Sequence, residues 1–183
     1  MAILNFKTAF NYPFNRAKGM WNILWFLLPI LGWFALGGYG VRIIQEFSKG
    51  KFKKLPLFKF KSDLKLGFFM FLKAIPFLIA YGIFIGILSI VNPSLMLVRI
   101  FMEIFVIPIL AIHFMNKQTV ASFFEFNILK PVFTNLGDYI MALLKSLLLG
   151  VVFFVMSIIL VGIPAGQFTK NIFLADFYRR KIK

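Results

Sequence analysis

The chain has 183 residues, of which 61% are hydrophobic and only 15% are charged, and its formal net charge is +15. That much apolar surface exceeds what a soluble core of this length can bury, so lipid must cover part of it. The absence of cysteine excludes disulfides, thiolate metal sites and cysteine catalysis. This length predicts one compact unit, so we expect a single membrane domain over residues 1–183.

Three long runs of residues contain no charged side chain. They span residues 19–41, 74–98 and 146–169, and lysines and arginines flank them. An α-helix needs about 20 apolar residues to cross the hydrocarbon core of a bilayer. The runs therefore predict an all-α fold, a polytopic integral membrane helical bundle.

The first 18 residues mix aromatic side chains with Lys7, Arg16 and Lys18. This pattern predicts an interfacial arm, since it lacks the apolar core and cleavage site of a signal peptide. The apolar segment 20–47 follows and contains Pro29 and Gly32, which interrupt helices. Two alternatives remain open here: one kinked spanning helix, or a broken helical hairpin whose ends lie on the same side.

A basic connector over 48–61 leads into a predicted helix over 63–91, with Asp63 as its N-cap. Gly82 and Gly86 in this helix have the spacing that allows two helices to approach closely. We expect them to pack against another helix of the same chain.

The second half of the chain repeats this alternation of helices and connectors. After a turn at Asn92-Pro93-Ser94 we expect a helix over 95–116, an interfacial connector over 117–137 and a helix over 138–163. Pro164 and Gly166 then predict a second break, followed by a short helix over 166–180. This last helix is too short to cross a bilayer, so a re-entrant hairpin is the alternative to a full crossing.

The positions of the basic residues favour one membrane topology over the other. Eight of the 21 basic residues fall between Arg42 and Lys65, and four more end the chain. Basic loops stay on the cytoplasmic side of a membrane, which favours two hairpins and places both termini in the cytoplasm. Such connectors bind anionic lipid headgroups, so we expect the bilayer rather than nucleic acid to be the partner.

Ionisable side chains inside apolar segments are the candidate functional residues. Arg99 and Glu103 lie four residues apart on one predicted helix face, either as a structural pair or as part of a site. We expect Glu103 to face the protein interior with a basic partner among Arg99, Lys73 and Lys170. Lys170 and Asn171 follow the predicted break at Pro164, as polar residues do at the interrupted helices of transporters.

Catalytic signatures are absent from the sequence. With six acids, one histidine and no clustered acidic pair, the chain is a poor candidate for acid–base chemistry. We expect no enzyme activity, no metal and no cofactor. Two function classes remain: a small permease-like or channel-type subunit with a polar cavity at Glu103 and Lys170, or a non-transporting scaffold or lipid- or partner-binding module. A homo-oligomer or a membrane partner subunit fits either class.

The order of these features resembles a domain-of-unknown-function family of small prokaryotic polytopic membrane proteins. The matching positions are Phe10, Tyr12-Pro13-Phe14, Pro29, Gly32, Gly38-Tyr39, Arg42, Gly50, Leu55-Pro56-Leu57, Asp63, Gly67, residues 123–126, Gly137-Asp138-Tyr139, Pro164 and Arg179. The chain departs from the family pattern at Leu57-Phe58-Lys59, where an acidic residue and Trp are usual. The resemblance implies an all-helical fold in the prokaryotic cytoplasmic membrane and no established activity.

Overall fold

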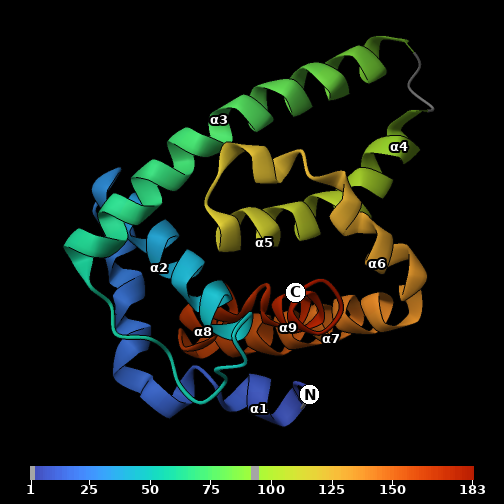
Figure 1. The fold of residues 1–183 in the computed structure, drawn as a ribbon. Helices are drawn as coiled ribbons and strands as arrows, with labels where there is room; N and C mark the ends of the chain where they lie inside the picture. Colours follow the sequence, from blue (N-terminus) through green and yellow to red (C-terminus); the bar gives the residue numbers. More distant parts are fainter. Residues whose placement is uncertain (1–2, 92–94) are drawn as a thin grey trace.

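The computed structural model describes residues 3–91 and 95–183, and every regular element in this part of the chain is a helix (Figure 1). The expected turn at Asn92-Pro93-Ser94 lies outside the described residues. The elements, with η marking 3-10 and π helices, are α1 Phe6–Asn11, η1 Phe14–Leu27, α2 Leu31–Phe47, α3 Phe60–Val91, α4 Met96–Phe101, η3 Met102–Val106, α5 Ile107–Lys117, η4 Val120–Phe123, η5 Phe126–Leu129, α6 Lys130–Thr134, α7 Leu136–Met156, η6 Ser157–Ile159, α8 Gly162–Thr169 and α9 Ile172–Lys181.

The first apolar segment is a hairpin rather than one kinked helix. η1 ends at Leu27, Pro29 and Ile30 form the turn, and α2 begins at Leu31 and packs back against η1. Ile30 has a φ of 65°, a left-handed conformation that a right-handed helix cannot contain. The predicted interruption at Pro29 is therefore confirmed, whereas Gly32 lies inside α2.

The N-terminal arm is part of the core and does not lie on the surface as the sequence suggested. Leu4, Ala9 and Tyr12 are fully or almost fully buried. The ring of Phe10 stacks on that of Phe153 in α7, with centroids 5.5 Å apart. The arm looked interfacial because it mixes aromatic and basic residues. Its aromatic side chains instead pack against α7, as Phe10 does on Phe153.

The backbones of α2 and α3 come into direct contact where the two helices cross. A Cβ atom added to Gly38 would lie 1.9 Å from the carbonyl oxygen of Asp63, and one added to Gly67 would lie 1.8 Å from that of Phe34. The two backbones therefore touch at a site that only glycine permits. Gly82 and Gly86 behave differently: added Cβ atoms there meet nothing within 4 Å, so the expectation that they pack inside the chain is wrong.

The connector after α5 is inserted between helices. Figure 1 shows it returning between α3 and α5 toward α6. Phe123 is buried there, its ring centroid 4.3 Å from that of Phe77 and 4.1 Å from that of Phe114. The expected interfacial connector over 117–137 is thus partly a packing element, because α3 and α5 leave room for an aromatic layer between them.

The C-terminal part is also a hairpin, since α8 and α9 pack along α7. Its break comes earlier than predicted, at Leu160, whose φ is 61°. Pro164 and Gly166 lie inside α8, and Pro164 is tolerated because it occupies the first turn, where backbone N–H groups have no partner within the helix. A second interruption falls at Lys170 and Asn171, between α8 and α9.

Three described helical stretches are long and apolar enough to cross a membrane: residues 60–90, 96–117 and 136–159. Only 6% of the most apolar window in the first of them is buried within the chain, which leaves most of α3 facing outward. Such an exposed apolar surface is what lipid covers. The structure therefore confirms an all-α fold in which three described helical stretches are compatible with a membrane protein.

Candidate functional site

Side chains from η1 and α2 hold the basic connector between α2 and α3 through its backbone carbonyl groups. The three consecutive carbonyl groups of Leu55-Pro56-Leu57 each accept a hydrogen bond from a different side chain. Arg16 donates to the first, the Tyr39 hydroxyl to the second at 3.0 Å, and Arg42 Nη2 to the third at 2.5 Å. Fixed carbonyls leave the lysine side chains of the same segment free to project outward.

A buried ion pair anchors the end of this connector to α3. Asp63 is fully buried, and its carboxylate lies 2.5 Å from Arg42 Nε and accepts a hydrogen bond from Arg42 Nη2 at 2.8 Å. It also accepts the backbone N–H of Lys59 at 2.7 Å. Asp63 is therefore not the N-cap: it sits within the first turn, and its carboxylate accepts the N–H of Lys59, the residue that precedes α3.

The connector forms a basic pocket of about 550 Å³. Glu46 is its only acidic lining residue, and the basic ones are Arg16, Arg42, Lys51, Lys53, Lys54 and Lys59. The two arginines are already bound to carbonyl groups, as described above. The four lysines are exposed, and within the described residues their ammonium groups make no ion pair. This pocket therefore has an excess of positive charge beside a backbone that is held at three carbonyl groups.

A second polar cluster joins the two ends of the described chain. The Asp176 carboxylate is buried and accepts the backbone N–H of Leu4 at 3.2 Å. It also accepts hydrogen bonds from Arg179 Nη2 at 2.7 Å and from Arg180 Nε at 3.0 Å. Lys181 Nζ lies 2.9 Å from the Asp138 carboxylate at the start of α7. These pairs satisfy a buried acid and lock α9 against the arm and α7.

His113 belongs to a third polar cluster, in which both of its ring nitrogens have partners. Its Nδ1 lies 2.7 Å from the Tyr178 hydroxyl, and its Nε2 lies 2.8 Å from the Glu125 carboxylate. The hydrogen bond to His113 lowers the pKa of Glu125 below its ordinary value. Both ring nitrogens are therefore engaged, and among residues 3–91 and 95–183 no group of three metal-ligating side chains comes together.

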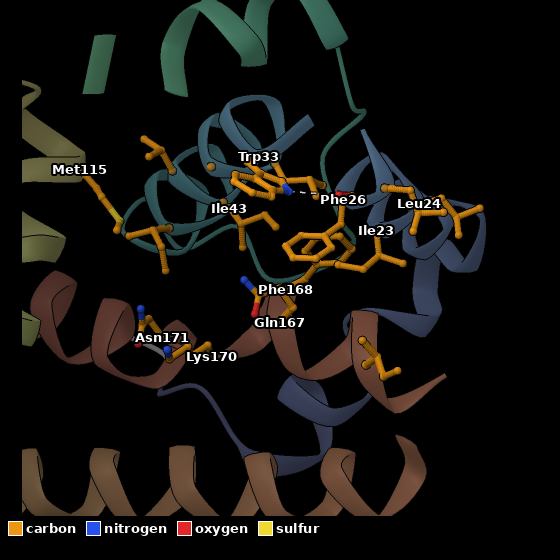
Figure 2. Close-up of a pocket in the computed structure, with 17 residues that line it drawn as sticks. Ile23, Leu24, Phe26, Trp33, Ile43, Met115, Gln167, Phe168, Lys170 and Asn171 are labelled. Carbon is orange, nitrogen blue, oxygen red and sulfur yellow. Dashed lines mark hydrogen bonds between the residues drawn. The ribbon is translucent and has the colours of Figure 1, made fainter. Parts of the chain in front are cut away.

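A cavity of about 700 Å³ lies between the first hairpin and the C-terminal one (Figure 2). Figure 2 shows Lys170 and Asn171 together at one end of its lining and Ile23 and Leu24 at the other. Gln167 also lines it, and the remaining residues are apolar or glycine: Ile23, Leu24, Phe26, Leu27, Trp33, Leu36, Gly37, Gly40, Val41, Ile43, Ile44, Met115, Ile163 and Phe168. The cavity therefore has one polar end and a long apolar wall.

The predicted intramembrane site does not form. Arg99 Nε and Glu103 Oε1 are 2.8 Å apart on α4 and η3, with Tyr81 of α3 nearby, and the two side chains are 50% and 46% exposed. Glu103 thus has the expected basic partner but does not face the interior, and it does not line the cavity that contains Lys170. Lys73 has a structural role: its Nζ donates to the carbonyl of Gln118 at 2.8 Å, beyond the last turn of α5.

Sequence reasoning missed most residues of the connector clamp. Arg16 was noted only as a basic residue of the arm, and Tyr39 and Arg42 appeared among the positions of the family resemblance without any structural role. The alternation of apolar and basic residues around Leu55-Pro56-Leu57 was the available signal, because a segment without regular structure must find hydrogen-bond partners for its carbonyl groups.

Comparison with known proteins places this geometry in a family. Residues 22–162 match the family described as "Protein of unknown function (DUF4013)". That stretch contains α2, the clamped connector, the three candidate membrane-crossing helices and most of the first hairpin. No curated protein and no solved structure matches the chain. Because the match covers more than half of its length, the chain belongs to the DUF4013 family of proteins of unknown function.

Proposed function

We propose that this protein is a non-transporting membrane module that binds anionic lipid headgroups through the basic pocket of the 48–61 connector. One observation carries the proposal: four exposed lysines surround a pocket whose backbone is held by Arg16, Tyr39 and Arg42. Lysine and arginine clusters beside membrane helices attract anionic lipids by about 1 kcal/mol for each basic residue. A rigid backbone reduces the entropy that is lost when a headgroup binds.

The alternative, a permease-like or channel-type subunit, depended on a polar cavity shared by Glu103 and Lys170, and Glu103 does not line the cavity that contains Lys170. That interpretation needs Glu103 and Lys170 to share a polar cavity, and the two residues lie in separate parts of the fold. Glu103 instead pairs with Arg99 on an outward face. The lipid-binding interpretation requires no such convergence and uses the charge that the connector displays.

Sidedness is part of the same proposal. We place the connector and both ends of the chain on the cytoplasmic face of a prokaryotic plasma membrane, following the distribution of basic residues. Arg179 lies over the ring of Phe52 at 5.2 Å, so the connector and the C-terminal helix share one face of the fold. The wild-type chain has no cysteine, so single cysteines at Lys53 and Lys181 should label from the cytoplasmic side alone. Labelling from opposite sides contradicts the proposed topology.

The lipid proposal is tested by replacing Lys51, Lys53 and Lys54 together with glutamine. We expect the purified variant to lose roughly 100-fold in affinity for phosphatidylglycerol, from about 1 kcal/mol for each lysine. Native mass spectrometry of the detergent-solubilised protein, titrated with phosphatidylglycerol and separately with phosphatidylcholine, measures this loss.

The matched control removes the same charge elsewhere. Lys7, Lys130 and Lys183 are exposed and lie outside the pocket, so their triple glutamine variant should bind phosphatidylglycerol like the wild type. If both variants lost the same affinity for phosphatidylglycerol, net charge alone would explain the binding and the pocket would have no specific role. Equal binding of the two lipids by the wild type would contradict headgroup recognition altogether.

A further inference from the structure

We propose that the cavity between the first hairpin and α8 binds one long-chain fatty acid, with the carboxylate at Lys170 and Asn171 and the hydrocarbon tail along η1 and α2. This site is separate from the basic pocket of the connector, with which it shares no lining residue. It would add a second class of ligand, recognised mainly by its tail.

The size and lining of the cavity match a single amphiphilic molecule. Its volume of about 700 Å³ falls inside the range of about 300–1,000 Å³ that small-molecule sites occupy. Such sites are mostly apolar, with a few polar groups that fix the orientation of the ligand. Here the polar groups are three and all belong to the α8–α9 region: Gln167, Lys170 and Asn171.

The polar end suits one anionic headgroup. Among the described residues no ion pair or hydrogen bond holds the Lys170 ammonium. Asn171 precedes α9 but makes no side-chain capping bond, so its amide is available to a ligand. One cation and two side-chain amides can satisfy a carboxylate, which carries one charge on two oxygen atoms.

The apolar part has room for a chain because two helix positions lack side chains. Gly37 and Gly40 line the cavity, and a Cβ atom added to either meets nothing within 4 Å. Glycine inside a helix costs about 1 kcal/mol relative to alanine, and here no helix packs against the space that it leaves. η1 contributes Ile23 and Phe26 to the lining, and the indole N–H of Trp33 in α2 donates to the Phe26 carbonyl at 3.1 Å.

The cavity opens toward the surface that faces lipid. Leu24, Leu27 and Ile163 line it and are 51%, 78% and 50% exposed, respectively. A fatty acid dissolved in the bilayer could therefore enter tail first without crossing water. One polar end and one continuous apolar wall favour a single-chain ligand over a phospholipid with two tails.

The test compares palmitate with hexadecanol, which has the same chain length and a neutral headgroup. The protein in phosphatidylcholine nanodiscs should bind palmitate more tightly than hexadecanol. Lys170→Gln should weaken palmitate binding on the order of tenfold, the loss of one charge-assisted contact, and leave hexadecanol binding unchanged. Gly37→Leu should weaken both ligands, because the new side chain fills the space of the tail.

Three controls make the result decisive. Gly82→Leu introduces the same side chain at an open helix position outside the cavity and should change neither affinity. The melting temperatures of the two leucine variants should agree, which separates filling of the cavity from unfolding. The Lys51, Lys53 and Lys54 triple variant should bind palmitate normally, so failure of the headgroup proposal and failure of this one are distinguishable.

Unchanged palmitate binding in Lys170→Gln or in Gly37→Leu overturns the proposal. Full displacement of palmitate when dipalmitoyl phosphatidylglycerol is added to the nanodisc also overturns it, in favour of a phospholipid with two tails.

Discussion

Two regions of the molecule each contain a pair of glycines and an acid–base pair: the α2–α3 crossing, and the outer half of α3 with α4. The crossing largely buries these residues, whereas the outer region leaves them exposed. At the crossing, Gly38 and Gly67 bring two backbones into contact, and Asp63 is fully buried against Arg42. In the outer region, Gly82 and Gly86 face open space. The acid–base pair of that region, Arg99 and Glu103, is about half exposed.

The difference shows that residue spacing alone does not determine packing. Two glycines four residues apart permit a close approach, but a second helix must be present to make it. The first hairpin folds back and supplies α2 as a partner for the beginning of α3, whereas most of the described outer half of α3 is exposed and Tyr81 is one of the few side chains there that pack inward. The same argument holds for ion pairs, because their contribution to the free energy of unfolding depends on whether neighbouring elements bury them.

The largest expected effect tests the two pairs of glycines. Gly67→Ala places a Cβ atom 1.8 Å from the Phe34 carbonyl oxygen, and backbone atoms cannot rotate away as a side chain can. Overpacking costs about 1–3 kcal/mol and more where the backbone itself must shift, so we expect a clear fall in melting temperature in detergent. Gly82→Ala should be neutral or stabilise the protein by up to about 1 kcal/mol. If the two variants melted together, the comparison between these regions would fail.

The next effect tests the two ion pairs. Asp63→Asn leaves Arg42 without its buried partner and should cost about 3–5 kcal/mol. Glu103→Leu should destabilise the protein less than Asp63→Asn does, because it leaves Arg99 unpaired at a site that is about half exposed. Replacing Arg99 and Glu103 together with leucine should restore stability. A double variant as unstable as Glu103→Leu alone would show that the outer pair has a role beyond neutralising its own charge. Chemical unfolding in mixed micelles provides all three values.

The smallest effect concerns the pair of Glu125 and His113, which lies between these extremes of burial. The lowered pKa of Glu125 means that its carboxylate stabilises the fold at pH values above the ordinary glutamate pKa. That contribution is lost as pH falls through the lowered, folded-state pKa. Glu125→Gln should therefore melt below the wild type at neutral pH and approach it in acid. A gap that stays constant across the titration would assign the effect to packing alone.

Sequence patterns predicted where the helices lie better than they predicted which elements each helix packs against. The predicted helices over 63–91, 95–116 and 138–163 agree with the three membrane-length stretches, whereas the charge-free run 19–41 forms a hairpin whose turn Pro29 marked. Helix length and backbone chemistry are local properties, so the sequence can indicate them. The second break was misplaced onto Pro164, since a proline in the first turn of a helix is compatible with that helix. Its actual position at Leu160 has no local signal of that kind.

The candidate sites depended on contacts between distant segments. Lys170 and Asn171 were identified from polarity near a break, and they do line a cavity. Glu103 was assigned to the interior because it is acidic and lies in an apolar segment, but the direction of a helix face depends on neighbours that one sequence does not specify. The clamp on Leu55-Pro56-Leu57 joins residues 15 to 39 positions apart, a distance over which no periodicity operates.

The bond between Leu4 and Asp176 has a consequence for the order of synthesis. The two residues are 172 positions apart, so the arm has no acceptor for this N–H until α9 has been made. At translation rates of about 5–20 residues per second, that interval lasts roughly ten to thirty seconds. During this time the apolar side of α1 must be shielded by lipid or by a chaperone, and a ribosome stalled before Asp176 should leave the arm open to proteolysis.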